Sequence, residues 1–508
     1  MKQLIGIFTG ILLFFILLLI PVNPEILPPA AQAVAATTLL MVVWWVTEAI
    51  PIQATALMPL VLFPLLGVLS PVEAATPYAD RIIFLFMGGF MIAMSMQRWG
   101  LHERIALNII NTIGTSPRML IFGFMVATAF LSMWISNTAT AMMMVPIAIA
   151  IIATILPSAE TTIDQMTPEQ RDFSECLVIS IAHAATIGGI ATIIGTPPNG
   201  IFIAQLGTIF PNAPPVDFFA WMKFGVPLAV IFLPVSWFWL TSWPYRNIPK
   251  KIEHGREVIQ DRLKALGSMS RGEKWTLLVF GLTALAWIFR TEKVIGDVVI
   301  PGINTIFPGV HDATIAIAGA ILLFLLPVNA RAGVFTMNWE WARKIPWGIL
   351  ILFGGGLSLS TAFIESGLAA VFMDYFATLG YLPIIVLMII IGIFVSLLTE
   401  VTSNTAISSV MMPIMAVTSV SIGIHPFILM LTATLAASLA FMLPVATPPN
   451  AVAYGTGYIT MHDMIRSGYV LNFIGVALIS ILMFTLIMWA LGFGIALPGW
   501  ALTPITGP

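Results

Sequence analysis

FLSMWISNTATAM at residues 130–142 and LLTEVTSNTAISS at residues 397–409 are related polar interruptions in long apolar runs. Both contain the tripeptide Ser-Asn-Thr, and the second copy follows the first by 267 residues. The same shift places residues 86–101 on residues 353–368, where the motif Phe-x-Gly-Gly and a Gly-Leu pair recur. One constant shift over so many positions predicts an internal repeat.

The chain is too apolar for a water-soluble fold of its length. Of its 508 residues, 59% are hydrophobic and 9% are charged, and the mean hydropathy is +1.00. The apolar runs are continuous rather than alternating, which predicts membrane-spanning helices of about 20 residues instead of a barrel. We therefore expect an all-α polytopic membrane protein with about eleven spans, near residues 4–22, 33–50, 52–69, 82–98, 177–207, 220–243, 275–290, 312–329, 346–364, 428–457 and 468–492.

Basic residues predict how these spans are oriented. With the N-terminus in the cytoplasm, seventeen Lys and Arg residues fall inside, and only four fall outside: Arg81, Lys223, Arg290 and Lys293. This split obeys the positive-inside rule and predicts a cytoplasmic N-terminus and an external C-terminus in the inner or plasma membrane. The first span has no small-residue cleavage site, so we interpret it as a retained helix rather than a signal peptide.

The connector at residues 246–274 carries eight of the inside cations, mixed with Glu253, Glu257, Asp261 and Glu273. This mixture favours a solvated amphipathic helix on the cytoplasmic surface over a patch that binds nucleic acid or lipid. Cys176 is the only cysteine, which excludes a disulfide within the chain and a thiolate metal site.

The predicted topology runs span 82–98 inward and its repeat partner 346–364 outward, so the two copies are inverted. Inverted repeats are typical of secondary transporters, which need two similar gates facing opposite sides. In each repeat we expect a re-entrant hairpin, at 119–155 and at 382–421, whose polar turn lies in protein or beside a water-filled cavity. The alternative is two ordinary spans joined by a tight turn.

A second motif, Thr196-Pro197-Pro198-Asn199, recurs as Thr447-Pro448-Pro449-Asn450, and each copy lies inside a long apolar run, at 177–207 and at 428–457. Two consecutive prolines remove two backbone donors and break a helix. Such a break leaves carbonyl groups for a cation and a helix N-terminus for an anion. Packing about a pseudo-two-fold axis would bring both breaks and both polar turns together near the midplane.

The composition of these segments predicts the cargo. Neither turn and neither Thr-Pro-Pro-Asn segment contains Arg or Lys, so a bound anion would meet only hydroxyls, carboxamides and helix ends. Burying a dianion without countercharge costs many kcal/mol, so cations must accompany it. Hydroxyl and carbonyl oxygens suit sodium, and no cluster of His, Cys or carboxylates suits a transition metal. We expect sodium-coupled anion transport, no enzyme activity and no nucleic-acid partner.

These paired motifs, together with Thr47-Glu48-Ala49-Ile50-Pro51, resemble the divalent anion/sodium symporter family over about residues 30–495. The resemblance implies a homodimer whose scaffold domains hold the interface while transport domains slide across the bilayer as elevators. It implies first scaffold helices at 1–118, a first transport repeat at 119–245, the connector at 246–274, second scaffold helices at 275–380 and a second transport repeat at 381–495.

The resemblance also implies the site residues. A first sodium site would use Ser132, Ser136, Asn137 and the carbonyl group of Gly195. A second would use Thr399, Thr402, Asn404 and the carbonyl group of Ala446. The substrate contacts would be Asn137, Thr138, Thr196, Pro197, Asn404, Thr405, Thr447 and Pro448. Ser132 and Thr399 are also related by the 267-residue shift, so the repeat pairs them independently.

The leading hypothesis for function is sodium-coupled symport of C4-dicarboxylates such as succinate, malate and fumarate. Alternatives are an exchanger of dicarboxylates or 2-oxoglutarate, a sodium-coupled sulfate or citrate transporter, a channel, or a membrane enzyme, for which no catalytic dyad is evident. The unaltered Ser-Asn-Thr pattern favours a dicarboxylate over sulfate.

Ionisable groups inside predicted spans are functional candidates by default. Glu400 lies beside the second polar turn, and the corresponding residue of the first repeat is Met133. Glu400 is either a proton site or a carboxylate that accepts hydrogen bonds from nearby hydroxyls or amides, and we expect the second. For Glu48 and His183 we likewise expect structural roles.

Overall fold

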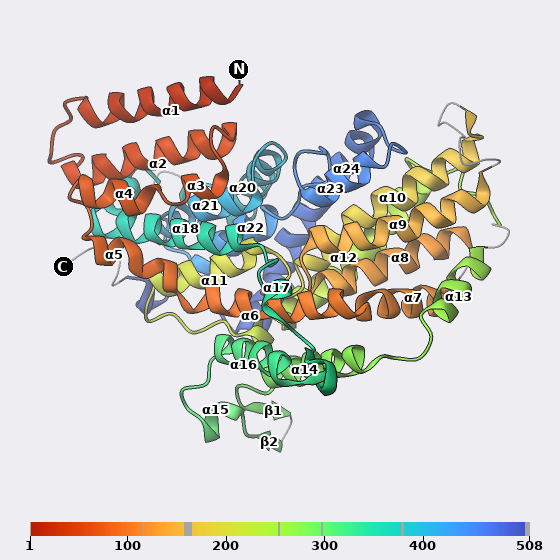
Figure 1. Cartoon of the computed structure of the whole chain (residues 1–508). Helices are drawn as coiled ribbons and strands as arrows, with labels where there is room; N and C mark the ends of the chain where they lie inside the picture. Colours follow the sequence, from red (N-terminus) through yellow and green to blue (C-terminus); the bar gives the residue numbers. More distant parts are fainter. Residues whose placement is uncertain are drawn as a thin grey trace.

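A computed structural model describes residues 2–114, 116–156, 165–251, 255–295, 298–376 and 380–502. The fold is mostly helical (Figure 1). In the described ranges, six helical stretches are long and apolar enough to cross a membrane: Pro29–Thr47, Pro71–Trp99, Asn137–Ile155, Phe218–Ser242, Trp347–Glu365 and Met461–Leu491. The prediction of a mostly helical protein with several membrane-length apolar helices is therefore confirmed.

The chain begins with an antiparallel pair, α1 (Lys2–Leu19) and α2 (Pro29–Thr47), at the edge of the molecule (Figure 1). The predicted span 52–69 is divided into two short helices by a turn at Ala56 and Leu57, just before Pro59, which has no N–H group to continue the helical hydrogen bonds. The helices that follow α2 are α3 (Ile52–Thr55), α4 (Met58–Leu65), α5 (Pro71–Ala75), the 3₁₀ turn η1 (Thr76–Ala79), α6 (Arg81–Trp99) and α7 (Leu101–Ile113).

The next part of the chain contains the first polar turn and the first Pro-Pro segment. Residues 133–136 are the turn between α8 and α9, and residues 190–196 are non-helical between α10 and α11. Proline stands at the first or second position of α8, α10 and α11, where its missing N–H costs nothing. The elements are α8 (Pro117–Ser132), α9 (Asn137–Ile155), α10 (Pro168–Gly189), α11 (Pro197–Ile209) and α12 (Phe218–Ser242).

The middle of the chain includes two small antiparallel strand pairs that the all-α expectation did not contain. β1 pairs with β2, with Lys293 opposite Ile300, and β3 pairs with β4. Both pairs lie in connections between helices. The elements are α13 (Gly255–Ala265), α14 (Arg271–Ile288), β1 (Lys293–Ile295), β2 (Val298–Ile300), α15 (Ile303–Ile306), α16 (Asp312–Leu325), β3 (Pro327–Asn329), η3 (Ala330–Ala332), β4 (Val334–Phe335), α17 (Trp339–Ala342), α18 (Trp347–Glu365) and α19 (Leu368–Phe376).

The last part repeats the pattern of the first polar turn and break. Residues 400–403 form the turn between α20 and α21, and residues 437–447 are non-helical between α22 and α23. The elements are α20 (Ile384–Thr399), α21 (Asn404–Ser421), α22 (Pro426–Ala436), α23 (Pro448–Gly455), α24 (Met461–Leu482), the π-helical turn η5 (Met483–Ile487), α25 (Met488–Leu491) and the 3₁₀ turn η6 (Gly499–Ala501).

The two repeats interleave. Helix α11, which follows the first break, contacts α21, which follows the second turn. In the same way, α23 contacts α9. Phe86 and Phe353, which the 267-residue shift relates, meet with their ring centroids 4.7 Å apart, and Gly200 leaves room for both rings. The two pairs of helices that flank the polar turns lie on opposite sides of the view, α8 and α9 to the right and α20 and α21 to the left (Figure 1).

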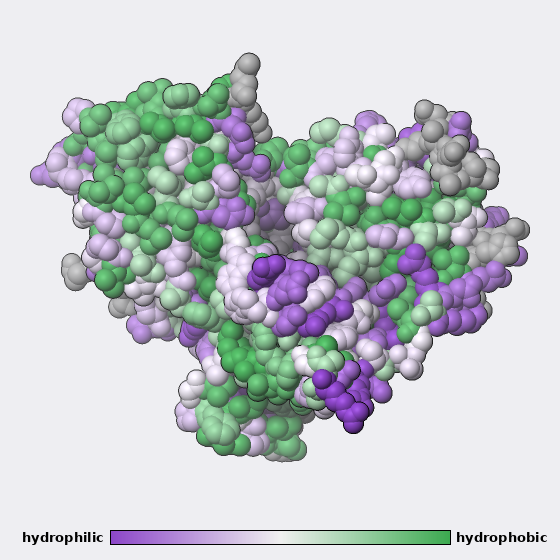
Figure 2. All heavy atoms as spheres, in the orientation of Figure 1, coloured by the Kyte–Doolittle hydropathy of each residue, from purple (hydrophilic) through white to green (hydrophobic). Residues whose placement is uncertain are grey.

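The connector at residues 246–274 contains the amphipathic helix α13, which contacts α7. Arg104 of α7 contacts both the end of α13 and the start of α14. Its guanidinium group donates to the carbonyl oxygens of Gly267 at 3.0 Å and Leu266 at 3.1 Å, and pairs with Glu273 of α14 at 2.6 Å. Figure 2 shows hydrophilic side chains gathered over α13 and α17, and hydrophobic side chains over much of the flank formed by α1 to α5.

Candidate functional site

The first polar turn gathers oxygen atoms from three segments. Ser132 Oγ lies 2.6 Å from Asn137 Oδ1 and donates to the carbonyl oxygen of Ala185 at 2.8 Å. With its nitrogen turned toward the break, the Asn137 carboxamide also lies 3.2 Å from the carbonyl oxygen of Gly195 and 3.1 Å from that of Ala185. Three of the four residues predicted for the first sodium site, Ser132, Asn137 and Gly195, therefore meet at one place.

The second turn repeats this arrangement. Thr399 Oγ1 donates to the carbonyl oxygen of Ala437 at 3.0 Å and also lies against Asn404 Oδ1. Thr399 takes the position of Ser132, Asn404 that of Asn137 and Ala437 that of Ala185. The cluster of a hydroxyl, a carboxamide and a main-chain carbonyl is thus present twice, and the 267-residue shift relates the hydroxyl and carboxamide positions.

Three other predicted ligands are placed differently. Ser136 and Ser403 are N-caps of α9 and α21, each accepting a backbone N–H at 3.4 Å from the residue three positions later. Thr402 Oγ1, in the turn, donates to the carbonyl oxygen of Leu398 in the last turn of α20 at 2.7 Å. Ala446 lies in the second break, and its N–H donates to Leu443 at 3.2 Å. Among the hydrogen bonds of the described residues, none joins Ala446 to Asn404.

The predicted substrate residues stand at helix N-termini. Thr196 is the N-cap of α11 and Thr447 that of α23, and Pro197 and Pro448 are the first residues of those helices. Thr138 and Thr405 are the second residues of α9 and α21. Four helices therefore start at the turns and breaks, each with a partial positive charge at that end, although α11 and α23 begin with two prolines that carry no N–H group. Such ends suit the carboxylate groups of an anion.

Sequence reasoning missed the residues that hold the breaks open. Asn199 Nδ2 donates to the carbonyl oxygens of Gly189 at 3.1 Å and Thr192 at 2.7 Å. Asn450 makes the equivalent bonds to Ala440 at 3.2 Å and Leu443 at 3.0 Å. The donors and acceptors of the two sets of bonds are related by the 251-residue shift. The repeated Asn of the Thr-Pro-Pro-Asn motif was therefore the signal that could have identified these residues.

Side chains from other segments also hydrogen-bond to the second break. Glu400 is 3% exposed, and its carboxylate accepts the backbone N–H groups of Phe441, Met442 and Leu443 at 2.8–3.1 Å and the side-chain amide of Asn472 at 2.7 Å. The ring of His183, on α10, lies 3.2 Å from the carbonyl oxygen of Phe441. These contacts favour the structural interpretation of both residues. Glu48 has φ 49° and ends α2 in a left-handed conformation.

The segments that contain the two clusters lack basic side chains. The sequence has no Lys or Arg between Arg118 and Arg171 or between Lys344 and Arg466. In the part of the chain that the structure describes, no group of three or more His, Cys, Asp or Glu residues could hold a metal ion. An anion at the turns would therefore depend on helix ends and on cations that arrive with it.

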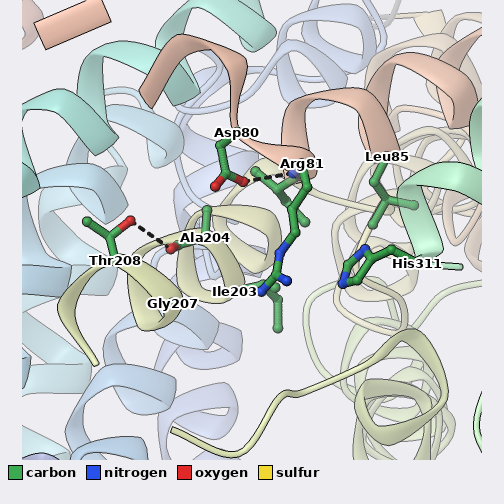
Figure 3. Close-up of a pocket in the computed structure, with 9 residues that line it drawn as sticks. Asp80, Arg81, Leu85, Ile203, Ala204, Gly207, Thr208 and His311 are labelled. Atoms are coloured by element: carbon green, nitrogen blue, oxygen red, sulfur yellow. Dashed lines mark hydrogen bonds between the residues drawn. The ribbon is translucent and has the colours of Figure 1, made fainter. Parts of the chain in front are cut away.

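A separate cavity of about 210 Å³ lies beside the start of α6 and the C-terminal half of α11, and contains none of the predicted site residues (Figure 3). Arg81 and His311 extend into it, whereas the hydroxyl of Thr208 turns back to Ala204. Burial and the nearby charges of Arg81 and Arg290 lower the pKa of His311 to about 4, so this ring is neutral at pH 7.

Comparison with known proteins extends over almost the whole chain. Residues 1–493 match the family model described as the sodium:sulfate symporter transmembrane region. A protein of Staphylococcus saprophyticus named sodium-dependent dicarboxylate transporter SdcS is 41% identical over 98% of this chain and 93% of its own length. A protein of the same name from Staphylococcus aureus is 42% identical, with the same coverage.

Two solved structures share the fold at low sequence identity. MtrF of Neisseria gonorrhoeae, an antimetabolite efflux pump, aligns with a TM-score of 0.56 at 13% identity, covering 84% of this chain and 85% of its own. The YdaH transporter of Alcanivorax borkumensis aligns with a TM-score of 0.53 at 14% identity, covering 93% of this chain and 100% of its own. The extent of the family match and the identity to the staphylococcal proteins together show that this chain belongs to the sodium:sulfate symporter family.

Proposed function

We propose that this protein is a multi-pass membrane transporter that carries small dicarboxylates together with sodium. One observation carries the proposal: a hydroxyl, an Asn carboxamide and a main-chain carbonyl meet at Ser132 and Asn137, and again at Thr399 and Asn404. Oxygen donors of this kind suit an alkali cation. The relatives named sodium-dependent dicarboxylate transporter, 41% and 42% identical, support the same assignment.

Each cluster would hold one sodium ion. The first would use Ser132, Ser136, Asn137 and Gly195, and the second Thr399, Thr402, Asn404 and Ala446. The dianion would lie between them against Asn137, Thr138, Thr196, Pro197, Asn404, Thr405, Thr447 and Pro448. Because these segments lack Arg and Lys, the sodium ions supply the positive charge that lets the dianion leave water. Coupling follows, since neither ligand binds well without the other.

At the level of the fold, the proposal includes eleven spans, two re-entrant hairpins at 119–155 and 382–421, and inverted repeats. The two transport repeats, 119–245 and 381–495, would move as an elevator against scaffold helices 1–118 and 275–380 in a homodimer. The interleaving of α11 with α21 and of α9 with α23 supports a single moving unit built from both repeats. The N-terminus would be cytoplasmic and the C-terminus external.

Uptake of radiolabelled succinate into proteoliposomes tests this function. We expect uptake to require an inward sodium gradient and to fail when potassium replaces sodium. Asn137→Ala and Asn404→Ala should each reduce uptake at least about 100-fold, since a buried ligand of both cation and anion is lost. Asn108→Ala, a change on the exposed face of α7 whose side chain bonds only to its own helix, is the control. Normal uptake by both site variants would refute the assignment.

Competition experiments separate the alternative cargoes and mechanisms. Unlabelled malate and fumarate should compete with succinate, whereas sulfate and citrate should not. Liposomes preloaded with succinate and free of sodium on both sides should show little uptake if the protein is a symporter. Rapid uptake under those conditions would identify an obligate exchanger instead.

A further inference from the structure

A buried ion cluster joins three helix ends outside the two oxygen clusters. Arg290, just after α14, pairs with Asp312 of α16 at 2.6 Å and with Asp217, the N-cap of α12, at 3.5 Å. Arg290 is 8% exposed and Asp312 only 2%. Asp312 also accepts the backbone N–H of Phe218 at 3.1 Å, and Thr291 donates to Asp217 at 2.9 Å. The cluster therefore connects the start of α12 to both α14 and α16.

Its members lie on helices that pack mainly against different neighbours. Helix α12 is tied to the first break, because Trp221 Nε1 donates to the carbonyl oxygen of Ile190 at 3.0 Å and Gly225 brings its backbone against Ala191. Helix α16 instead lies against α6, where Gly88 allows close approach to Ala316. Asp217 would therefore move with the first break, whereas Arg290 and Asp312 would stay with α6, α14 and α16.

The two ion pairs differ in strength. The Arg290–Asp312 pair is short and almost fully buried, while the Asp217 carboxylate lies farther away and its side chain is 11% exposed. Separating Asp217 from Arg290 leaves the guanidinium group paired with Asp312, while the Asp217 carboxylate keeps the backbone N–H of Ala220 at 2.7 Å. The Asp217–Arg290 contact can therefore open and close without disrupting either set of helices.

Aromatic rings connect this cluster to the first polar turn. Trp134, two residues before Ser136, stacks on Phe218 with centroids 6.1 Å apart, and Phe218 stacks on Trp287 at 4.3 Å. Trp287 Nε1 donates to the carbonyl oxygen of Asp312 at 3.0 Å. A change in the position of the turn would therefore reach the residues around Arg290 through three stacked rings.

We propose that Asp217 and Arg290 form a latch between the moving and static parts of the transporter, and that the Trp134–Phe218–Trp287 stack makes this latch sensitive to occupancy of the first turn. The proposal rests on the proposed function, because a latch requires two bodies that move. Asp217 and Arg290 are positioning residues here, and neither contacts substrate.

A thiol cross-link can report the latch. Lys293 Nζ lies 4.2 Å above the ring of Phe219, across the same boundary, so cysteines at 219 and 293 in a Cys176→Ala background would face each other when the latch is closed. A short bifunctional maleimide then measures the ratio of closed to open molecules. Asp217→Asn keeps an oxygen for the N-cap bond to Ala220 but removes the charge. We expect it to lower the closed-to-open ratio about tenfold.

Asp261→Asn is the matched control, since Asp261 forms an exposed pair with Lys264 on α13. It should leave the ratio unchanged. If Asp217→Asn also leaves the ratio unchanged in protein that elutes and melts like wild type, the latch is refuted. Succinate uptake by the same preparations tests the proposed function separately. If the wild-type protein shows no sodium-dependent uptake, that function is refuted, whatever the cross-link shows.

The ring stack has its own test. Adding sodium and succinate should change the closed-to-open ratio in wild type and in Trp134→Phe, which keeps a ring in the stack. Trp134→Ala should abolish this response while leaving the ratio without ligands within about twofold of wild type, because the Asp217–Arg290 pair is intact. A Trp134→Ala protein that responds like wild type would show that the rings do not connect the turn to the latch.

Discussion

At the scale of single residues, carboxamides are used where hydroxyls would not suffice, because a carboxamide has two N–H donors and a separate acceptor oxygen, whereas a hydroxyl has one proton to donate. Asn137 and Asn404 lie at the two oxygen clusters, and Asn199 and Asn450 hold the carbonyl groups of the breaks. The sequence indicated the first pair through the repeated tripeptide. The sequence did not predict the hydrogen bonds of Asn199 and Asn450. These bonds join residues seven to ten positions apart across a non-helical segment, and residue propensities do not predict the path of such a segment.

The Asn199 bonds lead to a prediction about sodium affinity. Asn199→Ala removes the donors that gather the carbonyl oxygens of Gly189 and Thr192, so the break that presents Gly195 should loosen. We expect the sodium concentration for half-maximal succinate uptake to rise about tenfold, while uptake at saturating sodium stays within about threefold of wild type. Initial rates measured across a sodium series test this.

Asn23→Ala is the control, because Asn23 caps an exposed turn at Glu25 and touches neither break. Asn450→Ala should behave like Asn199→Ala, because its bonds are the symmetric ones. Unaltered sodium dependence in both variants would show that the breaks keep their shape without these amides.

At the scale of helices and turns, patterns that depend on local chemistry were predictable. Consecutive prolines at 197–198 and 448–449 indicated interrupted helices, and the non-helical segments lie directly before them. The strand pairs β1–β2 and β3–β4 were not predicted. They lie in the connections between apolar runs, and the hydropathy pattern identifies only the runs. The cluster around Arg290 was not predictable either, since its two acidic partners lie 73 and 22 residues away from it in the sequence.

Close helix packing gives a prediction at this scale. A Cβ atom on Gly188 of α10 would overlap the backbone of Ala129 on α8, so these helices cannot stay in contact if the glycine is replaced. Gly188→Ala should destabilise the protein by about 1–3 kcal/mol, seen as a lower melting temperature in detergent. Gly281→Ala on α14 is the matched control, because no atom lies within 4 Å of its added Cβ. It should be neutral or stabilising, since alanine favours helix more than glycine. Equal melting temperatures for both variants would contradict the packing.

At the scale of the whole molecule, both repeats contribute to one chemical environment. Helix α10 of the first repeat contacts α23 of the second, and His183 reaches the carbonyl oxygen of Phe441. The first repeat therefore contacts the second break directly. Because the segments around both turns lack permanent cations, the free energy of binding a dianion should depend on sodium more than on any side chain.

Thermal stabilisation of purified protein measures this dependence directly, since a ligand that binds only the folded state raises the melting temperature by mass action. Sodium alone should raise it modestly, as two uncharged oxygen clusters can hold cations without the anion. Succinate in potassium or choline should have no effect, because the dianion would enter without countercharge. Both together should raise the melting temperature by more than the sum of their separate effects, since the coupling free energy between two ligands acts in both directions. Asn137→Ala should lose the synergy while Asn108→Ala keeps it. Equal stabilisation by succinate with and without sodium would mean that a fixed charge in the protein, and not the cation, receives the anion.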